Sequence, residues 1–246
     1  MGESLEKEGF WLQKVRTQNV FKQLETLLRE CCTRLYAANK IDNLNVTVAL
    51  HGENVIQTDV NLKYAKSTVG YYRATANPDV QWKLQQIQDA SNQCVRALQT
   101  LLKGIRKYDE AVASNSSSER IQELILTVLS LVKKNIKEAR CSLTLPKRKS
   151  LVELCQFQPI KSFNPPLPHD ILLSYYIASA KLVCAAYQVI SKVNGIQTVT
   201  IYTAECDLPH LVEVLKLLST SFSVAHEFMI NYCMLKRNFS SLLIVL

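Results

Sequence analysis

The sequence predicts a mainly α-helical protein with a small β part, an α+β fold in which an elongated antiparallel helical bundle carries a small antiparallel β-sheet subdomain. Apolar residues recur at the three- and four-residue spacing of helices over most of the chain. Alternation with a period of two, which is typical of strands, is confined to two short stretches. Only 6 Gly and 7 Pro occur among 246 residues, which disfavours the many tight turns of a sandwich.

The N-terminal part is predicted to start with a helix over 9–38, in which Phe21, Leu24 and Leu28 keep helical spacing. Apolar and polar residues then alternate over 45–75, on both sides of a turn at His51–Asn54. This alternation predicts a three-stranded antiparallel meander with one polar face.

The clearest helical pattern lies between Val80 and Tyr108, where apolar residues keep a 4–3 alternation through four heptads. We expect this helix to open at Asn77–Asp79, because Asn and Asp accept hydrogen bonds at helix N-termini. Asn115–Ser118 is predicted to connect it to a helix over 119–141, as an αα-hairpin.

The stretch Ile171–Ile190 is apolar and long enough to span a membrane. Lys181 lies at its centre, however, and a central Lys costs about 2.5–3.5 kcal/mol on insertion scales. We therefore interpret 168–192 as a buried helix of the bundle. Beyond it, the alternation of Val199 and Ile201 predicts a fourth strand.

The predicted domain organisation joins segments that are distant in the sequence. The helical bundle comprises 9–38, 79–141, 168–192 and 207–237; the β subdomain comprises 45–75 and 196–205; 142–167 is an irregular linker; and 238–246 is an atypical apolar tail. Matching apolar seams recur in 21–35, 121–136 and 211–232, so we expect the heptad residues to form an internal core more than a zipper between chains. The predicted core residues are Leu84, Ile87, Leu98, Leu101, Ile105, Leu211, Leu215, Leu218 and Phe222.

No group of residues resembles a catalytic or metal-binding motif. The 4 His lack a G-x-S-x-G or H-E-x-x-H context, and no Gly-rich phosphate loop occurs. The 8 Cys include no C-x-x-C pair, and Cys206 with His210 lacks a second pair of ligands. We therefore expect a non-enzymatic, cytosolic protein with reduced thiols, without cofactor or metal, and without a secretory signal.

The charge is strongly positive, at +8 overall, and 103–149 holds 11 Lys or Arg against 5 Asp or Glu. The basic candidates for partner binding are Lys133, Lys134, Lys137 and Arg140, followed by Lys147, Arg148 and Lys149. They fit an acidic protein partner, an anionic membrane surface or nucleic acid, or they are simply solvated. Nucleic acid is not expected, because no known reader motif accompanies them.

A second candidate surface is the polar face of the predicted meander, at Asp59, Asn61 and Lys63. Such a face is either solvated or docks a partner, since a small sheet with an exposed edge can accept another strand. The residues alone leave both interpretations open.

Several stretches resemble one known family. They are Thr58–Lys63 leading into Gln81–Asp89, then Leu143–Pro146, Pro166–Asp170 with Ile171–Leu173 behind it, and Glu205–Cys206 with Pro209. They occur in the family's order over about 10–237, and the chain thus resembles the Rogdi family of leucine-zipper-containing proteins. After Lys236–Asn238 the sequence departs from the family's polar tail.

The resemblance implies a helical bundle with a β domain built from both halves of the chain. It also implies membership of the RAVE, or rabconnectin-3, complex, which promotes assembly of the vacuolar-type proton-pumping ATPase (V-ATPase) and so acidification of vesicles, synaptic vesicles included. The expected partners are the large β-propeller-containing subunit and V-ATPase peripheral-sector subunits. The expected location is cytoplasmic, with vesicle or endosomal membrane association through the complex and a nuclear pool as a further option. The alternative is a general coiled-coil adaptor in vesicle trafficking that binds acidic membrane surfaces.

Overall fold

The computed structural model describes residues 2–36, 39–43, 46–62, 72–76, 82–156, 163–191 and 197–243. Its helices are α1 (Gly2–Arg34), α2 (Gln85–Ala113), α3 (Ser118–Thr144), α4 (Leu151–Gln156) and α5 (Pro209–Leu243), and its strands form two antiparallel sheets, which confirms the α+β class. The chain divides into two compact units, one of 1–33, 91–140 and 214–246 and the other of 34–90 and 141–213.

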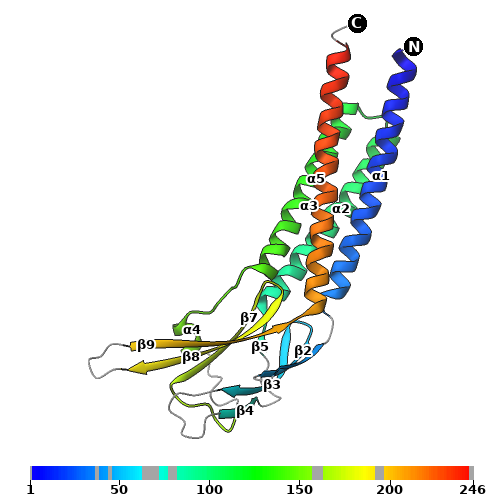
Figure 1. Ribbon diagram of the computed structural model, residues 1–246. Coiled ribbons are helices and arrows are strands. Elements are labelled where there is room, and N and C mark those ends of the chain that lie inside the picture. The colour runs from blue at the N-terminus through cyan, green and yellow to red at the C-terminus, as the bar shows by residue number, and fades with distance from the viewer. Residues whose placement is uncertain are drawn as a thin grey trace. The chain divides into compact units, whose positions relative to one another are not determined.

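The first unit is a bundle in which α1, α2, α3 and α5 run side by side (Figure 1). Each helix buries one stripe of residues at helical spacing, as amphipathic helices do. The buried residues include Leu24, Leu28 and Cys31 of α1, Cys94, Leu101 and Tyr108 of α2, Ile125, Leu129 and Ile136 of α3, and Leu218, Ser221 and Ala225 of α5. The predicted core residues Leu98, Ile105, Leu215 and Phe222 are half-buried, while Leu84, Ile87, Leu101, Leu211 and Leu218 are buried.

Two contacts show how closely the bundle helices approach. The rings of Phe21 and Tyr108 meet edge to face with centroids 5.7 Å apart. A Cβ added at Gly104 of α2 would lie 2.5 Å from a methyl carbon of Val128 on α3, so this pair of helices needs a glycine there. The heptad seam of α2 is therefore filled by helices of the same chain.

The connection between α2 and α3 is the predicted αα-hairpin. Asn115 has a φ of 51°, and its N–H donates to the Val112 carbonyl at 3.2 Å. The N–H of Ser116 donates to the Ala111 carbonyl at 2.9 Å, which completes a Schellman motif at the end of α2. Asparagine suits the left-handed position because its short polar side chain tolerates it.

The first sheet of the second unit has six strands. Their bounds are β1 (Asn39–Asn43), β2 (Val46–His51), β3 (Asn54–Leu62), β4 (Tyr72–Ala76), β5 (Trp82–Lys83) and β6 (Phe163–Asn164), in the order β1-β2-β3-β4-β6 with β5 on β3. The predicted meander corresponds to β2, β3 and β4, and Gly52 with a φ of 61° makes the tight turn. Trp82 and Lys83 were predicted in the helix but pair with Val55 and Asn54, so α2 starts later than its heptads indicate.

The prediction of a bundle helix over 168–192 is wrong. Ile171–Ala178 is strand β7 and Lys181–Ser191 is strand β8, paired as a hairpin, with β9 (Gln197–Asp207) on the far side of β8. Every residue from Ile171 to Ile177 and from Leu182 to Gln188 is buried. A strand buried on both faces loses the apolar–polar alternation, and its sequence then resembles a buried helix.

The hairpin turn gives no sequence signal either. Ser179 and Ala180 both have positive φ, at 51° and 61°, where Gly or Asn is usual. Their N–H groups donate to the carbonyls of Thr144 and Leu143 at 3.0 and 2.9 Å, so bonds to the end of α3 stabilise the turn. Lys181 follows the turn and lies 3.5 Å from carboxylates of Glu205 and Asp207. Among the described residues, no helix has the length and apolar character needed to cross a membrane.

Three smaller differences concern the remaining segments. The strand predicted over 196–205 exists as β9, but it joins β7 and β8 rather than the meander. The predicted irregular linker 142–167 holds the last turn of α3, the short helix α4 and strand β6. The main chain of the predicted tail continues α5 as far as Leu243, and 244–246 lie outside the described residues.

Candidate functional site

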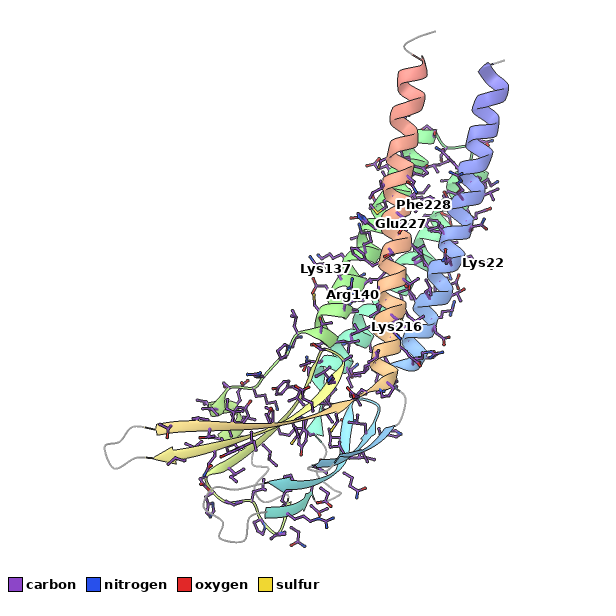
Figure 2. All side chains as sticks on the ribbon, in the orientation of Figure 1. Lys22, Lys137, Arg140, Lys216, Glu227 and Phe228 are labelled. Atoms are coloured by element: carbon purple, nitrogen blue, oxygen red, sulfur yellow. The ribbon has the colours of Figure 1, made fainter. Side chains whose placement is uncertain are left out.

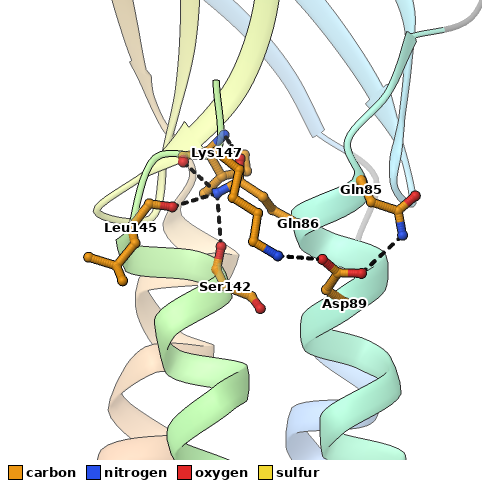
Figure 3. A network of polar contacts seen from close by, with 7 residues as sticks. Gln85, Gln86, Asp89, Ser142, Leu145 and Lys147 are labelled. Carbon is orange, nitrogen blue, oxygen red and sulfur yellow. Dashed lines mark hydrogen bonds and ion pairs between the residues drawn. The ribbon is translucent and has the colours of Figure 1, made fainter. Parts of the chain in front are cut away.

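At Ile177, the outer edge of strand β7 is closed by one buried glutamine from α2. Gln86 is 3% exposed, and the two hydrogens on its Nε2 are shared among the main-chain carbonyls of Ser142, Leu145 and Ile177, at 3.0, 2.8 and 2.8 Å. Its Oε1 accepts the N–H of Ile177 at 2.8 Å. Figure 3 shows this amide between the end of α3 and the sheet. The side chain thereby hydrogen-bonds like a neighbouring strand.

Trp82 closes the next position of the same edge. Its Nε1 donates to the Tyr175 carbonyl at 3.1 Å, and its ring meets the Tyr175 ring edge to face, with centroids 5.6 Å apart. Such an aromatic pair adds about 0.5–1.5 kcal/mol beyond the area that it buries. Trp82 belongs to the first sheet and Tyr175 to the second, so this pair also joins the two sheets of the unit.

The basic run after α3, predicted to bind a partner, contacts residues of its own unit. Lys147 forms an ion pair of 2.7 Å with Asp89 (Figure 3). The Arg148 guanidinium lies 5.3 Å from the centre of the Tyr176 ring, and the Lys149 ammonium lies 4.5 Å from the centre of the Trp82 ring. Each cation–π contact of this kind is worth about 0.5–1 kcal/mol.

The electrostatics around Asp89 favour its ionised form. Partial burial raises the pKa of the Asp89 carboxyl, but hydrogen bonds from Gln85 and Lys147 outweigh that effect and the net pKa is lowered. After the basic run, Ser150 begins α4 with a capping box, since the Glu153 N–H donates to the Ser150 hydroxyl oxygen at 3.3 Å and the Ser150 N–H donates to the Glu153 carboxylate at 2.7 Å. The Ser150 hydroxyl donates to the same carboxylate at 2.8 Å. These hydrogen bonds lower the pKa of the Glu153 carboxyl. Contacts of Lys147, Arg148, Lys149 and Ser150 therefore hold the segment 147–153 in place.

The other basic candidates lie on α3 in the first unit, where Figure 2 labels Lys137 and Arg140. Lys133 donates to Nδ1 of His226 at 3.0 Å and lies 5.1 Å from the centre of the Phe222 ring. Arg140 lies 5.9 Å from the same ring. Lys134 and Lys137 are exposed, and no ion pair to either occurs among the described residues. Of the four basic candidates on α3, these two remain open to a partner.

The polar face of the meander is only partly described. Asp59 accepts hydrogen bonds from Arg73 on the adjacent strand, at 3.1 Å to Nε and 2.5 Å to Nη2, and these bonds lower the pKa of the Asp59 carboxyl. The main chain of Asn61 lies in β3, opposite Arg73. Lys63 lies outside the described residues. The sequence did not indicate the Asp59–Arg73 pair.

The potential metal-ligand side chains in the part of the chain that is described are scattered. No three His, Cys, Asp or Glu there cluster closely enough to hold a metal ion. Burial raises the pKa of the Cys31 and Cys184 thiols to about 12, so both stay protonated and unreactive near neutral pH. Burial lowers the pKa of His210.

Sequence reasoning missed the roles of Trp82 and Gln86. Both lie in the Gln81–Asp89 stretch that carries the family resemblance, and both fall off the heptad seam. Their partners are main-chain atoms 56 to 93 residues away, which leave no mark in the sequence. The one available signal was the stretch itself, in which an aromatic residue and a glutamine stand four residues apart.

Comparison with known proteins gives a consistent result. The family model described as "Rogdi leucine zipper containing protein" matches residues 8–198. The "Protein rogdi homolog" of Caenorhabditis elegans is 36% identical, over 92% of this chain and 86% of the relative. The "Protein rogdi" of Drosophila melanogaster is 30% identical over 87% and 82%, and the "Protein rogdi homolog" of Danio rerio is 33% identical over 75% and 67%. None of these descriptions names a catalytic activity.

Proposed function

Because the chain belongs to the Rogdi family, we propose that it is a non-catalytic subunit of a RAVE- or rabconnectin-3-like complex. In this function it promotes assembly of the V-ATPase and so acidification of vesicles. Its partners are the large β-propeller-containing subunit and V-ATPase peripheral-sector subunits. It acts in the cytoplasm and reaches vesicle or endosomal membranes through those partners.

The family match over 8–198 carries the proposal. Two features of the structure are consistent with a subunit that works by binding. The heptad seam is filled within the chain, so partners must use outer surfaces. The exposed Lys134 and Lys137 offer positive charge on one helix, which suits an acidic protein surface and its attraction over a distance of about 10 Å.

A native purification tests the proposal directly. The tagged chain, purified from native lysate and crosslinked for mass spectrometry, should carry the large β-propeller subunit and peripheral-sector subunits. Recovery of neither would refute it. Vesicles from cells without the chain should also acidify more slowly, and the wild-type chain should restore the rate.

A pair of charge reversals tests whether the α3 surface takes part. Lys134→Glu with Lys137→Glu should weaken retention of the large subunit about tenfold, because like charges would then face an acidic partner. The matched control is Lys103→Glu with Arg106→Glu, two exposed basic residues at the same spacing on α2, with the same change of charge. Equal loss in both pairs would assign the effect to net charge alone.

The alternative, an adaptor on acidic membranes, requires binding to bare lipid. Vesicle flotation with and without anionic lipid separates the two functions, since only the adaptor floats in a salt-sensitive way without other proteins. Of the seven basic candidates, Lys147, Arg148 and Lys149 already contact Asp89, Tyr176 and Trp82. This engagement disfavours both the membrane function and nucleic-acid binding.

A further inference from the structure

Strand β9 forms an edge of the three-stranded sheet and exposes apolar side chains in its first half. Val199, Ile201 and Tyr202 are 38%, 51% and 39% exposed. No charged residue and no proline occurs from Gln197 to Ala204. Native proteins commonly guard edge strands with Lys, Pro or a bulge, because a bare edge pairs with other strands. This edge has none of these guards, and its register with β8 is unbroken.

The register of the sheet assigns the direction of each main-chain group in β9. The two-residue turn Ser179–Ala180 closes the β7–β8 hairpin at the pair Ala178 and Lys181, which exchange hydrogen bonds in such turns. Odd-numbered residues of β8 therefore bond towards β7, as the bond from the Val189 N–H to the Asp170 carbonyl at 2.8 Å shows. Even-numbered residues of β8 and β9 then bond to each other.

The N–H and C=O groups of Val199, Ile201 and Thr203 consequently point away from β8, because main-chain directions alternate along a strand. Within the described residues, no main-chain hydrogen bond reaches these outward groups, and β8 is the one strand that pairs with β9 (Figure 1). The segment thus offers a row of free donors and acceptors.

We propose that the outer edge of β9, residues 198–204, binds an extended segment of a partner protein as an added strand. The main chains pair through Val199, Ile201 and Thr203. On one face, Val199 lies opposite Val189 and Ile201 lies opposite Tyr187, so an apolar row already crosses β8 and β9. The partner segment is therefore uncharged in its centre and carries β-branched or aromatic residues at alternate positions, which continue that row.

This inference does not depend on which complex the chain serves, because it rests on the geometry of one sheet. Residue-resolved hydrogen exchange compares the isolated chain with the native complex purified through the chain. In the isolated chain, the amides of Val199, Ile201 and Thr203 should exchange fast while those of Thr200 and Tyr202 are protected by β8. In the complex, the three odd-numbered amides should also become protected. A partner that only covers a face of the sheet would not protect alternate amides selectively.

Variants at Ile201 test the main-chain hydrogen bond that its N–H would donate to the partner strand. Ile201→Pro removes an outward N–H and no bond to β8, and proline is tolerated at such edge positions. It should weaken partner retention about tenfold, the worth of one main-chain hydrogen bond in an interface. Ile201→Thr keeps the N–H and should retain the partner. Val199→Pro repeats the test at a second site if the first variant unfolds in circular dichroism.

Three results would overturn the proposal. The odd-numbered amides could exchange as fast in the complex as in the isolated chain. They could be protected in the isolated monomer already. Protection could also rise with the concentration of the isolated chain while light scattering shows a doubled mass, in which case the added strand is that of a second copy.

Discussion

The two edges of the β7–β9 sheet differ in what their outward main-chain groups meet. At the β7 edge, Gln86 bonds both the N–H and the carbonyl of Ile177, and Trp82 bonds the carbonyl of Tyr175. At the β9 edge, the corresponding groups of Val199, Ile201 and Thr203 have no such partner within the described residues. The β7 edge is thus closed by side chains at Tyr175 and Ile177, whereas the β9 edge is open within the described residues.

The difference shows which conspicuous residues serve the fold and which are available for function. The Gln81–Asp89 stretch is the most specific sign of the family, yet Trp82, Gln86 and Asp89 use their polar groups inside the second unit. Residues 197–204 of β9 include no charged residue and no motif, yet within the described residues the outward main-chain groups there keep their hydrogen-bonding capacity. The distinctive Gln81–Asp89 stretch thus makes contacts inside the fold, whereas the β9 edge, which is suited to a partner, has no distinctive sequence.

The largest expected effect comes from opening the closed edge. Gln86→Leu keeps the size of the side chain but leaves two buried carbonyls and the Ile177 N–H without their partner. Each buried group left unbonded costs about 1–3 kcal/mol, so we expect a loss of about 4 kcal/mol in the free energy of unfolding. Urea denaturation measures it. The matched control is Gln99→Leu at an exposed site of the same helix, which should change stability by less than about 0.5 kcal/mol.

A proline placed at each edge compares the two edges directly. Ile177→Pro removes an N–H that Gln86 binds, whereas Ile201→Pro removes one that faces solvent. Relative to alanine at the same position, the proline should cost about 3 kcal/mol at 177 and less than about 1 kcal/mol at 201. The alanine variants remove the contribution of the side chains, of which Ile177 is buried and Ile201 is exposed. Equal costs would show that the edges do not differ.

The helices and strands that could be predicted from the sequence are those that are buried on one side only. Helices such as α2 bury one stripe, and strands such as β2 and β3 hide one face, so their periods of 3.6 and 2 appear in the sequence. The β7–β8 hairpin could not be found in this way, because both faces of its strands are buried and its turn contains neither Gly nor Asn. Hydrogen bonds from the turn to the end of α3 stabilise the positive φ angles of Ser179 and Ala180, which Gly or Asn would adopt more readily.

The basic residues of the candidate site could be predicted from the sequence, but their contacts within the protein could not. A run of Lys147, Arg148 and Lys149 is visible in any reading of the sequence. Whether such cations are solvated depends on Asp89, Tyr176 and Trp82, which lie 28 to 67 residues away along the chain. Long-range contacts of this kind follow from the packing of the sheets, which the local pattern does not encode.

Loss of the hydrogen bond from the Trp82 indole should lower the free energy of unfolding less than Gln86→Leu or Ile177→Pro. Trp82→Phe retains most of the apolar ring but leaves the Tyr175 carbonyl without the indole donor. We expect a loss of about 1–2 kcal/mol, from this bond and from the weaker contact with Lys149. Thermal unfolding of the variant measures the loss. Lys149→Met separates the two contributions, and a Trp82→Phe variant as stable as wild type would exclude the indole bond as a support of this edge.

The smallest effect is expected at the ion pair beside the closed edge. The folded-state pKa of Asp89 lies below the ordinary value of 3.8, so the pair contributes stability above that pH and loses it as the pH falls through the lowered value. Because Lys147 is 57% exposed, the contribution at pH 7 is about 0.5 kcal/mol after screening. Asp89→Asn should therefore be less stable than wild type at pH 7 and equal to it in acid below the lowered pKa. Added salt should also narrow the difference at pH 7, and a difference that persists in acid would assign the effect to packing of the side chain instead of its charge.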